Sequence, residues 1–231
     1  DDVIEDAEKD GAPTAEFLSS SGFQFVETRG TYAVSIWCLS PSEAMHIHDE
    51  IFLRTCYLPP ESGLKLIGGN IGLFSVAAPP PGQTRRVIVD VGANIGLFSM
   101  WAARREPAAR LIAIEPATPN VQALRRNLSD NKLTNHVEIV HAALGASESR
   151  GKLTFYPNMP GNSTLFPQEK LEEAERCWST PERRAEMLSG ASVLDVGVTT
   201  LSTVFTQKGI TYVHRIALLK IDVEGSEVDV L

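Results

Sequence analysis

Apolar positions along this chain fall into short runs, separated by stretches with helical spacing. Four runs are typical of buried strands: Val87–Val91, Leu111–Ile114, His136–Ala143 and Ile216–Ile221. After the first run, Leu97–Ala103 begins a helix, and after the second, Val121, Leu124 and Leu128 recur at helical spacing. Strands that alternate with helices in this way predict an α/β fold with an open sheet.

The first strand, turn and helix carry the most informative motif. Asp90 is followed by Gly92, Ala93, Asn94 and Gly96, which gives Asp-x-Gly-x-Asn-x-Gly. Such a turn presents backbone N–H groups and a helix N-terminus to a ligand at the carboxyl end of a strand. A dinucleotide site would carry glycine where Asn94 stands, and Asp90 would repel a pyrophosphate but not a cation. An ordinary turn between a strand and a helix is the plain alternative.

Further acids follow other strands. Glu115 comes about twenty residues after the turn, where a carboxylate can accept hydrogen bonds from both ribose hydroxyls of a nucleoside. The last run leads into Asp222, Glu224 and Glu227, with Gly225 between them. These acids predict a ligand site along the carboxyl ends of the strands.

Together these segments resemble the FkbM family of methyltransferases over roughly residues 50 to 231. The matching segments are Asp90–Gly96, Glu115-Pro116, Asn120, Ala143–Gly145 and Lys220–Glu227. The segment Lys220–Glu227 is the most discriminating of these. The resemblance implies a Rossmann-like methyltransferase sheet with helices on both faces, S-adenosylmethionine as cofactor, and methylation of a hydroxyl oxygen on a small molecule, sugar, lipid or polyketide. It places Asp90, Gly92, Ala93, Asn94, Gly96, Glu115, Pro116, Asn120 and Ala143 at the cofactor.

The expected chemistry needs an aligned acceptor oxygen and a group that removes its proton, because the sulfonium is already activated. Asp222 and Glu224 are the expected catalytic residues, and both should point to one face if the strand stays extended. Glu227 is either a third acid of the site or a cap of the following helix. His141 and His214 are the other candidate bases, although strand-end surface positions suit each of them better.

Composition narrows the possibilities further. The chain has 231 residues, of which 43% are hydrophobic, and this length favours one domain with a real core. Its net charge of −8 argues against nucleic acid as a partner. Cys38, Cys56 and Cys177 are scattered and odd in number, which suits a reducing compartment and a cytoplasmic location. No run approaches the length of a transmembrane helix.

The expected organisation has one main domain. Residues 1–45 are acidic and rich in small residues, and they read as a linker or poorly ordered segment. Residues 46–231 form the methyltransferase domain, with insertions at about 62–84 and 157–190. We expect the domain to be cut within the helix after the last strand, and we interpret the chain as part of a longer polypeptide whose other domains are expected partners.

The sequences of the two insertions predict different local structures. Gly68–Ser75 contains the six residues of Asn94–Ser99 again, but it lacks a preceding acid and runs towards three prolines. We expect an inserted loop or short helix there, not a second site. Residues 165–190 predict one or two exposed helices around Pro181, either as a lid or as plain surface. Asp195–Gly197 is expected in an added strand, and the family's usual acid after Thr200-Leu201 is replaced by Ser202.

Two other functions and a metal site compete with this prediction. His46 and His48 would share a face of a strand with metal-binding potential, but no further ligands complete a shell, so no metal site is predicted. A catalytically silent cofactor-binding or structural module is the first rival function. A nicotinamide-dependent oxidoreductase is the second, and Asn94 and Asp90 disfavour it.

Overall fold

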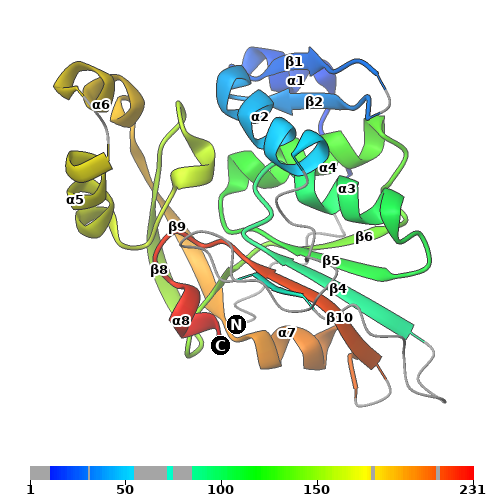
Figure 1. Ribbon diagram of the computed structural model, residues 1–231. Coiled ribbons are helices and arrows are strands. Elements are labelled where there is room, and N and C mark those ends of the chain that lie inside the picture. Colours follow the sequence, from blue (N-terminus) through cyan, green and yellow to red (C-terminus); the bar gives the residue numbers. More distant parts are fainter. Residues whose placement is uncertain (1–10, 31, 55–71, 75–84, 178–179, 212–213) are drawn as a thin grey trace.

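A computed structural model describes residues 11–30, 32–54, 72–74, 85–177, 180–211 and 214–231. Its main sheet has five strands in the order β3-β10-β4-β5-β6. The strands are β3 (Gly72–Phe74), β10 (His214–Ile221), β4 (Arg85–Val91), β5 (Arg110–Ile114) and β6 (Val137–Val140). All pair in parallel except β3, which is antiparallel to β10 (Figure 1).

Helices cover both faces of this sheet, as expected for a Rossmann-like methyltransferase fold. Side chains alternate along β4, so Ile88 packs on the side of α3 (Leu97–Arg105) and α4 (Thr118–Asp130). Val87 and Val89 pack on the other side, with Val204 of α7 (Leu201–Gln207). The strand order reverses between β4 and β10, and open α/β sheets bind ligands at such a reversal.

The strand expected over 136–143 is divided between two sheets. It leaves the main sheet at Val140, and β7 (Ala143–Leu144) pairs with β9 (Ser192–Thr199) in a second sheet. The order of that sheet is β7-β9-β8, with β8 (Ser149–Phe155) antiparallel to β9. The added strand predicted around Asp195 is therefore confirmed.

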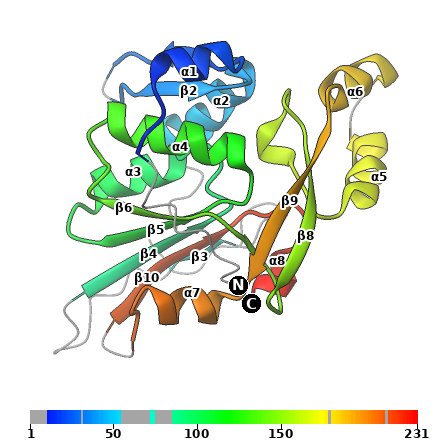
Figure 2. The same cartoon turned by 180° about the vertical axis from the view of Figure 1, so that it is seen from behind.

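The second insertion forms the two predicted helices. After a short 3-10 turn at Pro160–Asn162, α5 spans Pro167–Cys177 and α6 spans Pro181–Leu188. Both lie beside β8 and β9, away from the main sheet (Figures 1 and 2).

The amino-terminal part contradicts the expectation of a linker over residues 1–45. From residue 14 on, it folds into a small layer above α4, with Leu18 and Ile36 fully buried. Its elements are α1 (Ala15–Ser20), β1 (Gln24–Glu27), β2 (Ser35–Cys38), α2 (Pro41–His48) and a π-helix (Asp49–Leu53). His46 and His48 therefore lie on a helix and not on a strand.

Two asparagines, Asn127 of α4 and Asn131 at its C-cap, attach this layer. The side chain of Asn127 accepts from Trp37 N–H at 2.6 Å and donates to the Trp37 and Ile95 carbonyls at 3.1 and 2.9 Å. One turn later, Asn131 pairs with both backbone groups of Ser35. The two amides thus serve β2 as a neighbouring strand would, and this explains why a polar segment without a strong hydrophobic pattern is ordered.

The repeated segment differs from its expected form. Gly72–Phe74 is a strand on the outer edge of β10, not a loop or short helix. An unpaired strand edge offers backbone donors and acceptors, and these decide the conformation of a short segment. The rest of the 62–84 insertion lies outside the described residues. Within the part of the chain that the structure describes, no helix is long and apolar enough to cross a membrane.

Replacing Asn127 by alanine should destabilise the fold. It would leave three backbone groups of β2 and the turn without partners in a fully buried position. We expect a loss of about 2 to 4 kcal/mol in the free energy of unfolding, measured by chemical denaturation. Asn135→Ala, at an exposed position, is the control and should change it by less than about 0.5 kcal/mol. Equal effects of both variants would contradict this account of the attachment.

Gly96→Ala tests the packing of the turn on α4. Gly96 has a φ of 88°, and a Cβ there would lie 2.3 Å from Leu124 Cδ1. We expect a loss of about 2 to 4 kcal/mol, since both strain and overpacking act. Gly209→Ala is the matched control, because Gly209 has a φ of 62° and open space around its Cβ position. Gly209→Ala should lower the free energy of unfolding by only about 1 kcal/mol. If Gly96→Ala lowered it by no more than that, the Leu124 side chain would have moved aside without cost.

Candidate active site

The candidate site lies where β4 and β10 end side by side. Asp222 N–H donates to the Val91 carbonyl at 3.1 Å, so the chain leaving β10 stays against β4. A Cβ on Gly92 would lie 1.8 Å from the Asp222 carbonyl oxygen. Glycine is therefore required at position 92 by this backbone contact, and a larger residue there would separate the two strand ends.

A buried ion pair lies beneath the turn. Asp90 is fully buried, and its carboxylate accepts from Lys220 Nζ at 2.9 Å and from Ser99 Oγ at 2.7 Å. Lys220 also donates to the Gly92 carbonyl at 2.8 Å. Asp90 is predicted at the cofactor, but its two oxygens face inward, where Oδ1 accepts from Lys220 and Oδ2 accepts from Ser99. A buried charge needs such a partner, which is the physical reason for this orientation.

The turn itself uses its N–H groups internally. Those of Gly92 and Ala93 donate to the Ile114 carbonyl at 2.9 and 3.0 Å, and that of Gly96 donates to the Ala93 carbonyl. Asn94 N–H donates to Glu115 Oε2 at 2.8 Å. The expected anion-binding arrangement of this turn is therefore not present, because these donors already have acceptors.

Glu115 lies at the end of β5 and closes the turn from one side. Besides Asn94 N–H, it accepts from Ala117 N–H at 3.0 Å and Asn120 Nδ2 at 3.2 Å. Burial raises the pKa of Glu115, and these three donors act in the opposite direction. A carboxylate has about four acceptor positions, so roughly one remains for a ligand.

Asn94 is the residue of the turn whose side chain has a buried polar atom without a hydrogen-bond partner among the described residues. Its φ is 50°, a left-handed conformation, and its Oδ1 is buried without a hydrogen-bond partner among the described residues. The 3-10 turn lies against it, since a Cβ on Gly161 would approach Asn94 Nδ2 to 2.9 Å. Buried amide oxygens without partners are rare, so this atom points to a missing donor.

Two cavities meet at Asn94. The first runs along the ends of β5 and β7 and contains most of the predicted cofactor residues. Its wall includes Gly92, Asn94, Ile114, Glu115, Pro116, Asn120, Ala143, Leu144 and Leu153. Pro116, Asn120 and Ala143, three of the residues predicted at the cofactor, thus line the same cavity as Glu115. Neither Asp90 nor Gly96 lines either cavity.

The second cavity lies on the other side of the turn, against α2. Its polar wall consists of Glu43, His46, Glu50, Asn94, Asn162, Lys220, Asp222 and Glu224, together with Gly92 and Gly161. Glu43 is not among the residues predicted from the sequence, because the segment that carries it has the composition of a linker. Its position after the N-cap Ser40 marks the start of a helix, but nothing local indicates that this helix reaches the site.

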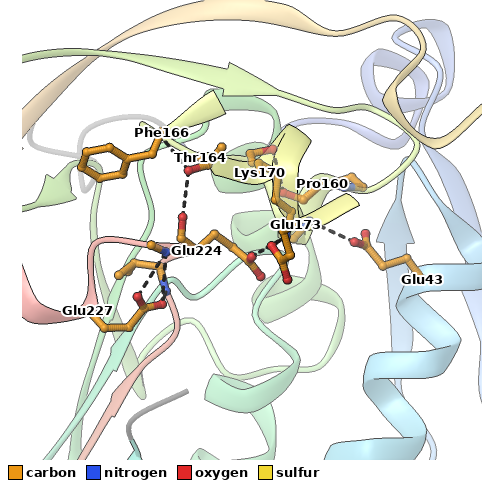
Figure 3. A network of polar contacts seen from close by, with 12 residues as sticks. Glu43, Pro160, Thr164, Phe166, Lys170, Glu173, Glu224 and Glu227 are labelled. Carbon is orange, nitrogen blue, oxygen red and sulfur yellow. Dashed lines mark hydrogen bonds and ion pairs between the residues drawn. The ribbon is translucent and has the colours of Figure 1, made fainter. Parts of the chain in front are cut away.

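The two predicted catalytic acids both border the second cavity, in different environments. β10 ends at Ile221, and Glu224 has a φ of 52°, so the alternation expected for an extended strand does not apply. Glu224 pairs with Lys170 Nζ at 2.7 Å, and its carbonyl accepts from Thr164 Oγ1 at 2.8 Å (Figure 3). Asp222 lies 3.9 Å from Lys220.

Lys170 belongs to α5 in the second insertion. It is buried, and it also pairs with Glu173 at 2.9 Å (Figure 3). Burial raises the pKa of Glu224, and the ammonium of Lys170 acts against this. The second insertion is therefore more than a surface addition, since it supplies the cation that faces a predicted catalytic acid.

The remaining candidate bases have local roles. Glu227 accepts from the N–H groups of Gly225 and Val223 at 3.1 and 3.3 Å, as a cap of the turn would. His141 lies 3.1 Å from the Pro116 carbonyl. The side chain of His214, the other candidate base, lies outside the part of the chain whose side chains are described. His48, considered above as a metal ligand, is buried and stacks on Phe52 at 4.7 Å. Among the described residues, no group of three potential metal ligands occurs.

Comparison with known proteins agrees with this geometry. The methyltransferase FkbM domain family matches residues 90–231. The chain is 37% identical over 210 residues to methyltransferase sdnD of Sordaria araneosa, covering 86% of this chain and 71% of that protein. It is 32% identical over 195 residues to methyltransferase 1 of Beauveria bassiana, covering 82% and 66% respectively.

A third relative is much longer. The AMB antimetabolite synthetase AmbE of Pseudomonas aeruginosa is 31% identical over 219 residues, which cover 84% of this chain and 9% of the synthetase. No solved structure matches the chain. The family match covers every residue that lines the first cavity and those of the second cavity from Gly92 onward, and the chain is a methyltransferase of the FkbM family.

Proposed function

We propose that the chain transfers a methyl group from S-adenosylmethionine to a hydroxyl oxygen of a small molecule. The observation that carries the proposal is the arrangement around Asn94. Glu115 lines the first cavity, Asp222 lines both cavities, and the buried Asn94 Oδ1 lacks a donor within the described residues. A nucleoside ligand with amino and hydroxyl groups has donors for all three.

In this proposal, the first cavity holds the nucleoside. Glu115 accepts a hydrogen bond from the ribose, and since about one acceptor position is free, one hydroxyl binds directly. Ile114, Ala143 and Leu144 offer an apolar wall for a base. These groups fit an adenosine moiety without any phosphate contact.

The second cavity holds the cationic end and the acceptor. S-adenosylmethionine, when bound, supplies an activated methyl group, so the protein has to align the acceptor and take up its proton. Asp222 and Glu224 favour a positive charge there, because both carboxylates border the cavity. Asn94 offers its amide oxygen to a donor in either cavity.

The rival nicotinamide-dependent oxidoreductase fits less well. A pyrophosphate needs free N–H groups at the turn, and those of Gly92, Ala93, Asn94 and Gly96 donate within the protein. The buried Asp90 adds no positive potential there. We therefore favour a cofactor without a pyrophosphate.

The rival hypothesis of a catalytically silent module is based partly on Ser202, which replaces the family's usual acid after Thr200-Leu201. This residue is exposed in the first turn of α7 and lines neither cavity. Its departure from the family pattern thus does not count against catalysis. We retain a small hydroxyl-bearing molecule as the acceptor and the cytoplasm as the location, and the long synthetase among the relatives favours a small-molecule product over a nucleic acid.

Asn94→Gly should separate binding from stability. Glycine keeps the left-handed conformation and removes the buried oxygen that has no partner. We expect the free energy of unfolding to change by less than about 1 kcal/mol, while the affinity for S-adenosylhomocysteine falls about tenfold or more in titration calorimetry.

Lys132→Gly is the matched control for this variant. Lys132 has a φ of 60° and is exposed, so its replacement tests the same backbone change away from the site. It should leave the affinity unchanged. Wild-type affinity in Asn94→Gly would remove Asn94 from the proposed site, and binding of NADH in place of S-adenosylhomocysteine would overturn the proposed function.

A further inference from the structure

Four carboxylates line the second cavity, and their partners differ. Glu50 forms an exposed pair with His46, 3.4 Å away. Glu224 pairs with Lys170 at 2.7 Å, and Asp222 lies 3.9 Å from Lys220. Glu43 has no cationic partner among the described residues. Its Oε1 accepts from Gly161 N–H at 3.1 Å (Figure 3). A proton acceptor has to exchange its proton readily, and a strong ion pair with a cation opposes protonation.

The surroundings of Glu43 favour its neutral form. Burial raises its pKa to about 7, the N–H of Gly161 and the Asn162 side chain lower it, and the charge of Glu224 raises it. Since general bases work best with a pKa near the operating pH, Glu43 suits this task. Other charged or titratable groups surround this carboxylate. His46 of α2, Glu50 of the π-helix, and Lys220 and Asp222 at the end of β10 line the same cavity, and Cys38 of β2 interacts electrostatically with Glu43.

We propose that Glu43 of α2 is the proton acceptor of this site and faces the methyl group to be transferred. The inference rests on the proposed function. The proton lost by the acceptor hydroxyl is held at a Glu43 carboxylate oxygen and later passes to water. Glu224, fixed by Lys170 and Thr164, is then a positioning residue that keeps negative charge beside the cation.

The 3-10 turn gives Glu43 a defined orientation. A Cβ on Gly161 would lie 3.2 Å from Glu43 Oε1 and 2.9 Å from Asn94 Nδ2, so the turn is held between both side chains. Asn120, in the wall of the first cavity, donates to the Pro160 carbonyl at 3.5 Å. The three-residue turn Pro160–Asn162 therefore connects Glu43 to the wall of the first cavity.

Sinefungin tests this assignment without a known acceptor, because an amine replaces its methylsulfonium centre. If Glu43 faces that centre, the bound ammonium lowers the pKa of Glu43, and Glu43 loses its proton on binding. The affinity of the full chain for sinefungin should then rise about tenfold between about pH 6 and pH 8, measured by titration calorimetry. Glu43→Gln should remove this pH dependence and keep the hydrogen bond to Gly161. S-adenosylhomocysteine, which has no cation at this centre, should show little pH dependence with either protein.

Thermal unfolding provides a second measurement. The pKa of Glu43 lies above that of an exposed glutamate, so its contribution to stability is present below about pH 4.5 and is lost as pH rises through about 7. Glu43→Gln should therefore melt at a higher temperature than the wild type at pH 8, and near the wild-type temperature at pH 4.5. A carboxylate that only bridges α2 and Gly161 would give a lower melting temperature at both.

Glu50→Gln and His46→Gln are the matched controls. Glu50 and His46 form an exposed pair 3.4 Å apart at the edge of the same cavity. Each variant changes a titratable group on the same wall, and both should retain the pH dependence of sinefungin binding. Transfer of the effect to either control would assign the proton to that residue and overturn the proposal.

The outcomes separate the two proposals. If the wild type binds neither sinefungin nor S-adenosylhomocysteine, the proposed function fails. If it binds both, and the pH dependence is absent or persists in Glu43→Gln, only the assignment of Glu43 fails.

Discussion

The buried pair of Lys220 and Asp90 is the interaction on which the site depends. It joins the ends of the two central strands, and the ammonium also holds the Gly92 carbonyl at 2.8 Å. Ser99 adds a hydrogen bond from the first turn of α3. Strand, turn and helix are thus fixed to one buried charge, and loss of either partner would leave an uncompensated ion in the core.

This arrangement gives the turn a different purpose from that of a phosphate-binding loop. Its N–H groups stabilise the turn itself, because they donate to Ile114, Glu115 and Ala93. What the turn offers a ligand is the amide oxygen of Asn94 and, beside it, the carboxylate of Glu115. Under the proposed function, recognition at this site relies on acceptors, and acceptors select ligands rich in N–H, O–H and positive charge.

The parts that lie outside the central sheet complete the second cavity. α2 brings Glu43, the turn at Pro160–Asn162 covers Asn94, and α5 brings Lys170 to Glu224. Each of these segments is remote in sequence from the residue that it contacts. This assembly determines the partner of each acid. Glu224 is paired with Lys170, and Glu43 accepts a hydrogen bond from the neutral N–H of Gly161.

The sequence by itself determined the central fold and one side of the site. The apolar runs specify β4, β5 and β10 because buried parallel strands need continuous apolar residues. The acids that follow them had to meet at one edge, so Glu115, Asp222 and Glu224 could be predicted as neighbours of a ligand.

The tertiary structure alone decided which way each polar side chain points. Asp90 turned inward because a lysine 130 residues away needed a partner in the core. Residues 14–48 became ordered because Asn127 of α4 and Asn131 at its C-cap satisfy the backbone of β2, a contact that no periodicity reveals. Glu43 joined the site for the same reason, since its place depends on where that layer docks and not on the residues around it.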